Sequence, residues 1–489
     1  MTLQGMPLRA KGTIIAPLYA PRLICLHLCV SGAYGCGMST PLTYGGHIRA
    51  ILTLGLPLIG GHLGQIAIGV TDTVMMGWYG IEGLAAVTLA STFFFVLFIF
   101  GSGFAWAVMP MVAAFDAEAD EVGIRRATRM GLWLSLGFGL LALPVMIWGA
   151  PLLRLIGQGD ALSAEAGRYL AVAGYGIVPA LLVMTLKSYL AALGRTQIVF
   201  WITMAAAVVN VLANYALIFG NWGAPELGVV GAAIASVSTQ IVSLIGVLVY
   251  IVIGVPQHSL FVRLWRLDAQ MLVQVFRLGW PIGLTALSEV GLFAASAMMM
   301  GWLGTIPLAA HGIAVQLASI TFMVHLGLSN AATIRAGNAH GKRDVARMGR
   351  GAITVMVMSA IFAALTTVVF VGWPEPLISI FMQKGEPSRD QILAIGVGLL
   401  VMAALFQFVD GAQAIALGLL RGVQDTRVPM WMAAFSYWGI GAPCSYILGF
   451  TMGWGGIGVW SGLVIGLGLA AVLLNARFWG VTIKGLSHP

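Results

Sequence analysis

Long apolar runs separated by short polar segments organise this sequence from about Ile51 onward. Each run is long enough to cross a bilayer, which takes about 20 residues in a helix. Because lipid offers the backbone no hydrogen-bond partners, such runs are predicted to be helical. We therefore predict an all-α integral membrane protein with twelve transmembrane helices. They cover residues 51–76, 84–115, 131–150, 169–193, 198–220, 228–254, 271–300, 307–334, 351–373, 392–420, 428–450 and 455–480.

Composition excludes an ordinary soluble domain. Hydrophobic residues make up 59% of the chain and charged residues only 9%, against about 25% charged in soluble proteins. Pro57 and Pro281 lie inside two of the apolar runs, where membrane helices tolerate proline. The composition therefore leaves the helix assignment intact.

The positions of the basic residues indicate the orientation. With the residues before Ile51 inside, most Lys and Arg fall in inner loops, and the outer loops carry only Arg154, Arg168, Lys384 and Arg389. The positive-inside rule then places both termini in the cytoplasm, in a protein of the cytoplasmic (inner) membrane. This bias explains the net charge of +8, so we expect no nucleic-acid partner.

Residues 1–46 form a poorly defined extension to which we assign no role. The apolar piece from Ile14 to Val30 is interrupted by Pro17, Pro21 and Arg22, so it makes a poor spanning helix or signal peptide. Met38 is an alternative start that would leave one cysteine, Cys444. The sequence does not decide whether residues 1–37 are translated.

An internal repeat divides the remaining chain. The segment from Pro57 to Ala86 aligns with that from Pro281 to Ala310, and "MMGWYGIEGLAA" matches "MMGWLGTIPLAA". The repeat predicts an amino-terminal six-helix lobe over 47–254, a cytoplasmic linker over 255–270 and a carboxy-terminal six-helix lobe over 271–489. Six helices each give both lobes the same direction through the membrane, related by a pseudo-two-fold axis along its normal. That plan suits alternating access around a central cavity.

Only three of the 17 acidic residues, Asp72, Glu289 and Asp410, lie well within apolar runs. An ionised side chain at membrane depth costs at least about 2.5 kcal/mol, so it usually faces a polar cavity or a partner. His62, Gln65 and Asp72 share one face of the first helix with Gly69. We predict that these acids mark an ion or substrate path.

Further polar residues extend this prediction to other helices. Asn210 and Asn214 lie one turn apart on the fifth helix, as do Gln407 and Asp410 on the tenth. The repeat aligns Gln65 with Glu289, and Asp72 with a serine. We therefore expect two non-equivalent polar sites. Coupling-cation residues are Asp72, Asn210, Asn214, Glu289 and Asp410, and substrate-cavity residues are His62, Gln65, Thr203, Thr285, Gln407 and Gln413.

The chemistry of these residues leaves alternatives open. Carboxyl groups bind Na+ with the help of amide oxygens, or they take up and release a proton, and the sequence does not choose between them. Each acid could instead be a structural partner of a neighbouring helix, and the asparagines could join helices. We expect no Lys or Arg at comparable depth.

Three segments together resemble the multidrug and toxic compound extrusion (MATE) transporters, in particular their NorM-like branch. They are "LGLPLIGGHLGQIAIGVTDTVMMGWYG" of the first helix, "GWPIGLTALSEVGLFA" of the seventh and "FQFVDGAQAIALGLLRGVQDTRVP" of the tenth. The resemblance covers nearly the whole chain from about Met38.

This resemblance implies export of organic cations and dyes in exchange for Na+ or H+. It implies that Asp72, Asn210 and Asn214 form an amino-lobe cation site, and that Glu289 and Asp410 form a carboxyl-lobe site, which favours Na+. Some family members carry a tyrosine where this chain has Phe406.

We predict a secondary active antiporter that is not an enzyme. The chain has no DDxxD, HExxH or nucleophile-elbow motif. The alternative is a flippase for a lipid-linked or other amphipathic metabolite. We expect small organic cations and membrane lipids as partners, a monomer, no cofactor, and no metal beyond Na+ as a coupling ion.

Overall fold

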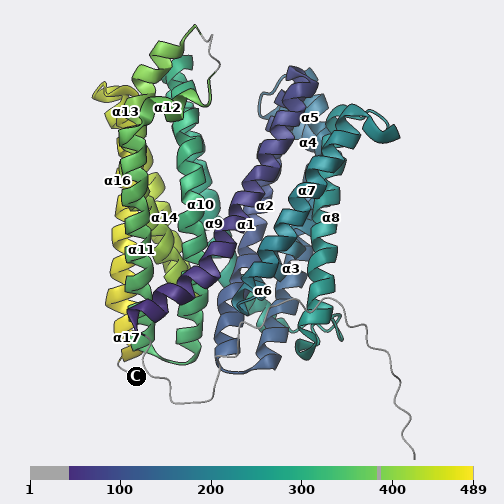
Figure 1. Ribbon diagram of the computed structural model, residues 1–489, viewed down its shortest axis with the longest axis vertical. Helices are drawn as coiled ribbons and strands as arrows, with labels where there is room; N and C mark the ends of the chain where they lie inside the picture. Colours follow the sequence, from purple (N-terminus) through teal and green to yellow (C-terminus); the bar gives the residue numbers. More distant parts are fainter. Residues whose placement is uncertain (1–42, 383–386, 488–489) are drawn as a thin grey trace, which may run out of the picture. The chain divides into compact units, whose positions relative to one another are not determined.

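A computed structural model describes residues 43–382 and 387–487 of the chain (Figure 1). This described part consists of helices and the loops that connect them. The described residues form one compact unit. Most of the predicted extension over residues 1–46 lies outside the described residues, and its last residues belong to the first helix, which begins at Tyr44.

The amino-terminal half contains six long helical segments and one short helix. We call this half the amino lobe. Its helices are α1 (Tyr44–Tyr79), α2 (Ile81–Ala117), α3 (Glu121–Ile147), the short α4 (Gly149–Leu155), α5 (Asp160–Ala173) continued through η1 (Gly174–Gly176) into α6 (Ile177–Ala192), α7 (Thr196–Phe219) and α8 (Gly228–Gly254).

The carboxy-terminal half, the carboxyl lobe, repeats this plan. Its helices are α9 (Ala269–Leu303), α10 (Thr305–Gly341), α11 (Val345–Gly372), the short α12 (Pro374–Ser379), α13 (Arg389–Gly422), α14 (Arg427–Ala434), η4 (Phe435–Gly441), α15 (Ala442–Tyr446), η5 (Ile447–Thr451), α16 (Gly455–Arg477), η6 (Phe478–Ile483) and α17 (Lys484–Ser487).

The prediction of twelve membrane helices is confirmed. Within the described residues, eleven helices are long and apolar enough to span a membrane. The twelfth is the unbroken run from α14 to η5, in which η4 and η5 are π-helical turns. Pro443 near the start of α15 cannot donate to the carbonyl four residues earlier, and the wider π turn accommodates that gap.

Several helices extend beyond their predicted ends. α3 begins at Glu121, about ten residues before the predicted apolar run, so Arg125, Arg126 and Arg129 belong to its first turns. Hydropathy detects only the part of a helix that lies in lipid, and the polar first turns continue outside it.

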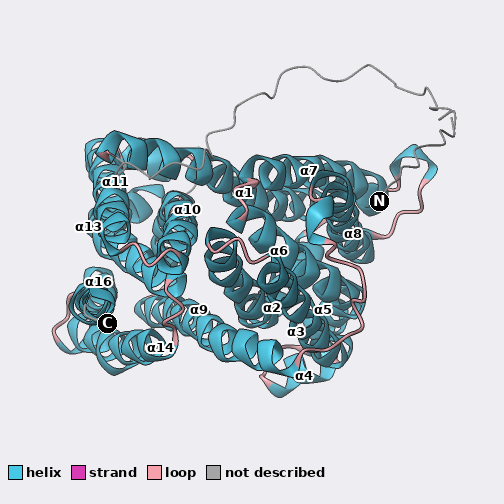
Figure 2. Cartoon of the chain, turned by 90° about the horizontal axis from the view of Figure 1, so that it is seen from below, coloured by secondary structure: helices cyan, strands magenta, loops and turns pink. Residues whose placement is uncertain are grey.

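The two lobes pack separately and meet along a few helices. Figure 2 shows α2 to α8 gathered on one side, and α10, α11, α13, α14 and α16 on the other. α13 packs against α10, α11 and α16. Contacts between the lobes come chiefly from α2 with α9 and α10, and from α1 with α10.

Glycines make these contacts between lobes unusually close. A Cβ added to Gly103 of α2 would lie 2.4 Å from the Gly283 nitrogen and 2.5 Å from the Gly279 oxygen of α9. A Cβ added to Gly341 of α10 would lie 2.4 Å from the Ala114 oxygen of α2. Small residues allow helix backbones to approach in this way, so the lobes meet backbone against backbone.

The linker between the lobes is held against α3. The Arg129 guanidinium donates to the carbonyl oxygens of Leu260 at 2.6 Å and Ser259 at 2.9 Å, and also to that of Val262. Arg126 pairs with Asp268 at 2.5 Å, just before α9 begins. These bonds satisfy linker carbonyls that have no helical partner.

Candidate functional site

A partly buried carboxylate and two buried asparagines form the first polar cluster, in the amino lobe. The Asn210 and Asn214 side chains of α7 both donate to Asp72 Oδ1 of α1, at 3.0 and 2.5 Å. Asn214 Nδ2 also donates to Asn210 Oδ1 at 3.2 Å. The structure therefore brings together the three residues that the sequence proposed for the amino lobe.

The close approach of α1 to α7 positions this cluster. A Cβ on Gly60 would lie 2.8 Å from the Phe200 ring, and one on Gly64 would lie 2.0 Å from the Met204 methyl group. Because neither glycine has a side chain, the two helices pack closely at this point. Two turns further along α1, Asp72 then lies within reach of the α7 amides.

Two residues of this cluster were missed by the sequence analysis. Ser236 of α8 donates to Asp72 Oδ2 at 3.4 Å. Tyr169 of α5 is buried and close enough to interact with Ser236, Ser91 and the Asp72 carboxylate. A signal for Ser236 exists, because Ser236, Thr239 and Ser243 follow the spacing i, i+3, i+7 of one helix face. We call Asp72, Asn210, Asn214, Ser236 and Tyr169 the Asp72 cluster.

The Asp72 cluster offers hard oxygen ligands for a cation in a largely buried part of the amino lobe. Asn210 and Asn214 are each 0% exposed, and within the described chain Asn214 Oδ1 has no hydrogen-bond partner. Buried polar atoms without partners are rare and call for an explanation. A carboxylate beside an unpartnered amide oxygen suits a small cation, and the carboxylate alone suits a proton.

A second polar cluster lies in the carboxyl lobe. Glu289 of α9 interacts with Gln413 of α13 and is close enough to Asp410 for their charges to interact. Asp410 is 2% exposed and Gln413 is 1% exposed. Tyr437 of η4 interacts with the same three side chains. We call Glu289, Asp410, Gln413 and Tyr437 the Glu289 cluster.

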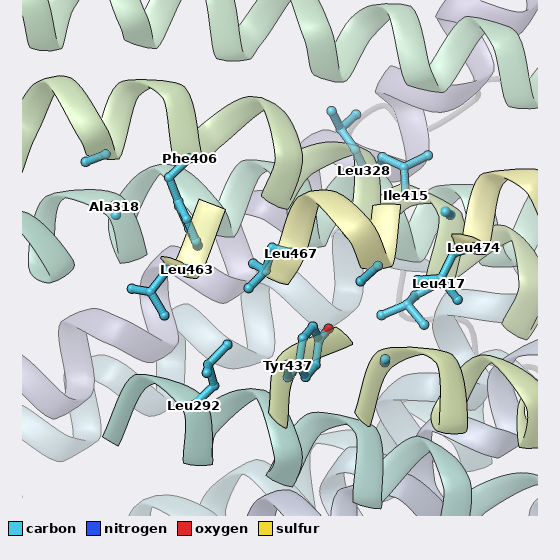
Figure 3. Packing of buried hydrophobic residues seen from close by; sticks show 14 of the residues in the cluster. Leu292, Ala318, Leu328, Phe406, Ile415, Leu417, Tyr437, Leu463, Leu467 and Leu474 are labelled. Atoms are coloured by element: carbon cyan, nitrogen blue, oxygen red, sulfur yellow. The ribbon is translucent and has the colours of Figure 1, made fainter. Parts of the chain in front are cut away.

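Several oxygen atoms of the Glu289 cluster take part in no hydrogen bond. Among the described residues, Asp410 Oδ1, Gln413 Oε1 and the Tyr437 hydroxyl have no hydrogen-bond partner. Figure 3 shows Tyr437 packed with buried apolar side chains of the carboxyl lobe, including Leu417 and Leu467. Two carboxyl groups and further free oxygens in an apolar surrounding form a place where a cation or proton would be stabilised.

Tyr437 also changes the significance of Phe406. Phe406 is 2% exposed and packs edge-on against Phe293 and Trp460, so its position contributes packing. Tyr437 brings a phenol oxygen to the Glu289 cluster from another helix. No polar pattern in the sequence pointed to Tyr437, since it follows a single serine in an apolar run.

The predicted cavity residues divide into two groups. Gln413 belongs to the Glu289 cluster, and Gln407 lies near it, with Nε2 donating to the Ala318 carbonyl at 3.4 Å. Thr285 is buried, but its hydroxyl bonds to the Pro281 carbonyl of its own helix. The structure therefore gives Thr285 no visible part in the cluster.

The amino-lobe cavity residues show a different pattern. The His62 ring lies 3.0 Å from the Asn330 amide of α10, a bond between the lobes. Gln65 is exposed. One face of α1 contacts α7 and another contacts α10, and Gln65 lies on the face between them. Thr203 is buried and accepts a hydrogen bond from Lys187 Nζ at 2.9 Å.

The expectation that no Lys or Arg lies deep in the helices is wrong. Lys187 of α6 bonds to Thr203, about two turns into α7, and its charge reaches His62. The Arg421 charge reaches Glu289 in the carboxyl lobe. Lys187 lies within the predicted run 169–193 and Arg421 just after the run 392–420, and long basic side chains are tolerated there when their charged ends find polar partners.

Two similar helix bundles, each with a buried polar cluster, define a polytopic membrane transporter rather than an enzyme. A family model described as MatE matches the chain twice, over residues 57–216 and 281–447. The chain therefore belongs to the MatE family, the multidrug and toxic compound extrusion transporters.

Relatives place the chain in the NorM-like branch of that family. It is 44% identical over 445 residues to the probable multidrug resistance protein NorM of Rhizobium meliloti (strain 1021), covering 91% of this chain and 95% of the relative. The protein of the same name from Agrobacterium fabrum (strain C58 / ATCC 33970) is 45% identical over 434 residues, covering 88% and 93%.

Solved structures share the fold. A crystal structure of MATE in complex with MaL6 matches with a TM-score of 0.82 at 20% identity, covering 91% of this chain and 98% of that one. An outward-facing multidrug resistance MATE family transporter of the MOP superfamily matches with a TM-score of 0.81 at 20% identity, covering 91% and 97%.

Proposed function

We propose that this protein is a secondary active antiporter that exports amphipathic organic cations, such as drugs and dyes, in exchange for Na+ or H+. The Asp72 cluster carries this proposal, because a partly buried carboxylate held by two buried amides at 3.0 and 2.5 Å attracts either a small cation or a charged substrate. The names of the NorM relatives, probable multidrug resistance proteins, support the same substrate class.

Ion coupling follows if a cation binds one conformation of the lobes better than the other. Each lobe contains one buried acidic cluster, and the lobes meet across glycine-lined helix contacts that can separate. The coupling ion and the organic cation then compete for the same negative charge. The Glu289 and Asp410 pair, together with the Tyr437 oxygen, favours Na+ as the ion.

The orientation we propose is that of a cytoplasmic (inner) membrane protein with both termini in the cytoplasm. Basic residues gather at the start of α3 and in the linker, including Arg125, Arg263 and Arg266. Such residues remain on the cytoplasmic side during insertion. The transporter works as a monomer, since each chain contains both lobes, and it needs no cofactor.

A second candidate function is a flippase for an amphipathic lipid-linked metabolite. Lys187 and Arg421 favour it, because a pyrophosphate or other anionic headgroup requires a cation inside the helices. The two proposals differ in the charge of the transported molecule.

Transport by purified protein in liposomes tests both proposals. Ethidium movement is measured under a Na+ gradient alone and under a pH gradient alone, beside movement of a fluorescent phospholipid. The antiporter predicts ethidium accumulation that one gradient drives and that Asp72→Asn abolishes, with Lys187→Gln retaining it. Lipid movement without gradient-driven ethidium transport would contradict the antiporter and favour the flippase.

A further inference from the structure

A polar cavity on the carboxyl lobe lies apart from both acidic clusters. It has a volume of about 800 Å³ and opens between the first turns of α9 and the turn joining α13 to α14. Its walls include Gln274, Arg277 and Trp280 of α9, and Gln424, Thr426 and Arg427 of the turn.

The walls are built from two segments that are tied together. Gln274, Arg277 and Leu278 share one face of α9 at spacings i, i+3 and i+4. Thr426 Oγ1 donates to the Leu278 carbonyl at 3.2 Å. Gln424 holds a left-handed backbone conformation, with φ 62°, which turns the chain around the cavity. This geometry fixes the distance between α9 and the turn.

The cavity carries positive charge. Arg277 and Arg427 are exposed, and neither forms an ion pair with an acid in the described part of the chain. The acid on the wall, Asp425, pairs with Arg477 at 2.6 Å, so its charge is already matched. The two free guanidinium groups, with neighbouring amides as donors, suit a phosphate group.

The surroundings of the cavity are apolar. Trp280 of α9 is itself one of the lining residues, and Val428 is 39% exposed and Trp431 63% exposed. Val428 follows Arg427 in the chain and Trp431 lies one helical turn after it, at the end of the helices where the basic loops gather. Trp side chains are enriched at the membrane interface. A ligand here would have a charged end in the cavity and hydrocarbon beside the helices.

We propose that this cavity binds the headgroup of an anionic phospholipid, with its phosphodiester between Arg277 and Arg427. Basic pockets between transmembrane helices are suited to such headgroups. A free phosphate ion has the same charge but gains nothing from Trp280, Val428 and Trp431, and the cavity, at about 800 Å³, is much larger than one phosphate. The apolar border therefore selects a lipid.

The position links lipid binding to the contact between lobes. Gly279 and Gly283, which pack against α2, lie on the opposite face of the α9 stretch that lines the cavity. A bound lipid holds this stretch and the α13–α14 turn together. A lipid bound in the cavity then makes the part of α9 that packs against α2 more rigid.

The test measures lipid binding to the full-length protein in detergent by native mass spectrometry, so its result does not depend on transport. Phosphatidylglycerol and phosphatidylcholine are titrated separately. The double variant Arg277→Gln with Arg427→Gln is compared with a matched control, Arg263→Gln with Arg266→Gln, which removes two exposed charges from the linker. Inorganic phosphate is added as a competitor in a further arm.

We expect wild type to bind phosphatidylglycerol at least about tenfold more tightly than phosphatidylcholine. The cavity variant should lose that preference, whereas the linker variant keeps it. The two single substitutions, each expected to weaken binding about threefold, serve if the double variant folds poorly. Equal loss in the cavity and linker variants, or no preference in wild type, overturns the proposal. Displacement of the lipid by millimolar phosphate would replace it with a free-phosphate site.

Discussion

Replacement of Asp72 by asparagine removes the negative charge of the Asp72 cluster while keeping the size of the side chain. The carboxylate accepts both α7 amides on Oδ1 and the Ser236 hydroxyl on Oδ2. In Asp72→Asn the remaining oxygen still accepts from Asn210 and Asn214, and the new amide donates to Ser236. We therefore expect the fold to be retained and only the negative charge to be lost.

The lost charge sets the size of the effect. A monovalent cation about 4 Å from a carboxylate gains about 4 kcal/mol at an effective dielectric constant of about 20. Each factor of ten in affinity corresponds to about 1.4 kcal/mol. Asp72→Asn should therefore weaken binding of a cation at this cluster by roughly 10³-fold. Ser236→Ala removes one long hydrogen bond of 3.4 Å and should cost about threefold or less.

Equilibrium binding of ²²Na+ and of ethidium to the purified variants measures these effects, with thermal unfolding as the check on folding. The expected order of cation affinity is wild type, Ser236→Ala and then Asp72→Asn. Wild-type affinity for both ligands in a folded Asp72→Asn protein would refute the assignment of Asp72 as a cation ligand.

Three further predictions concern the lobe contact, the linker and the Glu289 cluster. In Gly283→Ala the new Cβ lies 2.3 Å from the Phe100 carbonyl oxygen, so we expect α2 and α9 to separate and the free energy of unfolding to fall by about 1–3 kcal/mol. Gly312→Ala, whose Cβ meets nothing within 4 Å, is the control, and equal unfolding of the two variants would contradict a tight contact. The hydrogen bond from Arg126 lowers the pKa of Asp268, so the ion pair stabilises the protein above about pH 4, and that contribution is lost as the pH falls through the lowered pKa. Asp268→Asn retains the cap on the Met271 amide, and we expect it to cost less than about 1 kcal/mol at pH 7 and to reduce the acid dependence of unfolding, whereas an unchanged pH profile would exclude the pair as its source. Tyr437→Phe removes a hydroxyl that lies near Gln413 and the two carboxyl groups but forms no well-aligned hydrogen bond in the described residues, so ²²Na+ affinity of the carboxyl lobe should fall while stability stays within about 0.5 kcal/mol, and unchanged Na+ binding would remove Tyr437 from the site.

The fold was largely predictable from the sequence because hydropathy is a local property. A run of about 20 apolar residues has few alternatives to a membrane helix, so the helices were found even where Pro443 forces a π turn. The buried acids were found for the same reason, since a carboxyl group inside such a run is costly wherever the helix packs.

Contacts between helices decided what the sequence could not. Tyr169 and Tyr437 join the clusters from helices whose own patterns gave little signal. The helix of Ser236 has a polar face, but its pattern does not show which acid that face meets. Thr285 shares its helix with Glu289, yet its hydroxyl bonds to its own backbone. The face of a helix on which a side chain lies is predictable from its sequence spacing. The neighbouring helix that this side chain contacts depends on how the helices cross in the folded protein.

The sequence by itself determined the number of helices, the repeat and the positions of three costly acids, because each follows from the transfer of side chains between water and lipid. Only the tertiary structure decided which oxygens surround those acids, that Lys187 reaches Thr203, and that Arg277 and Arg427 line one cavity. Close contacts at glycines, such as that of Gly64 with Met204, determine how the helices cross. Such packing joins residues far apart in the sequence, so it leaves no repeating pattern from which it could be predicted.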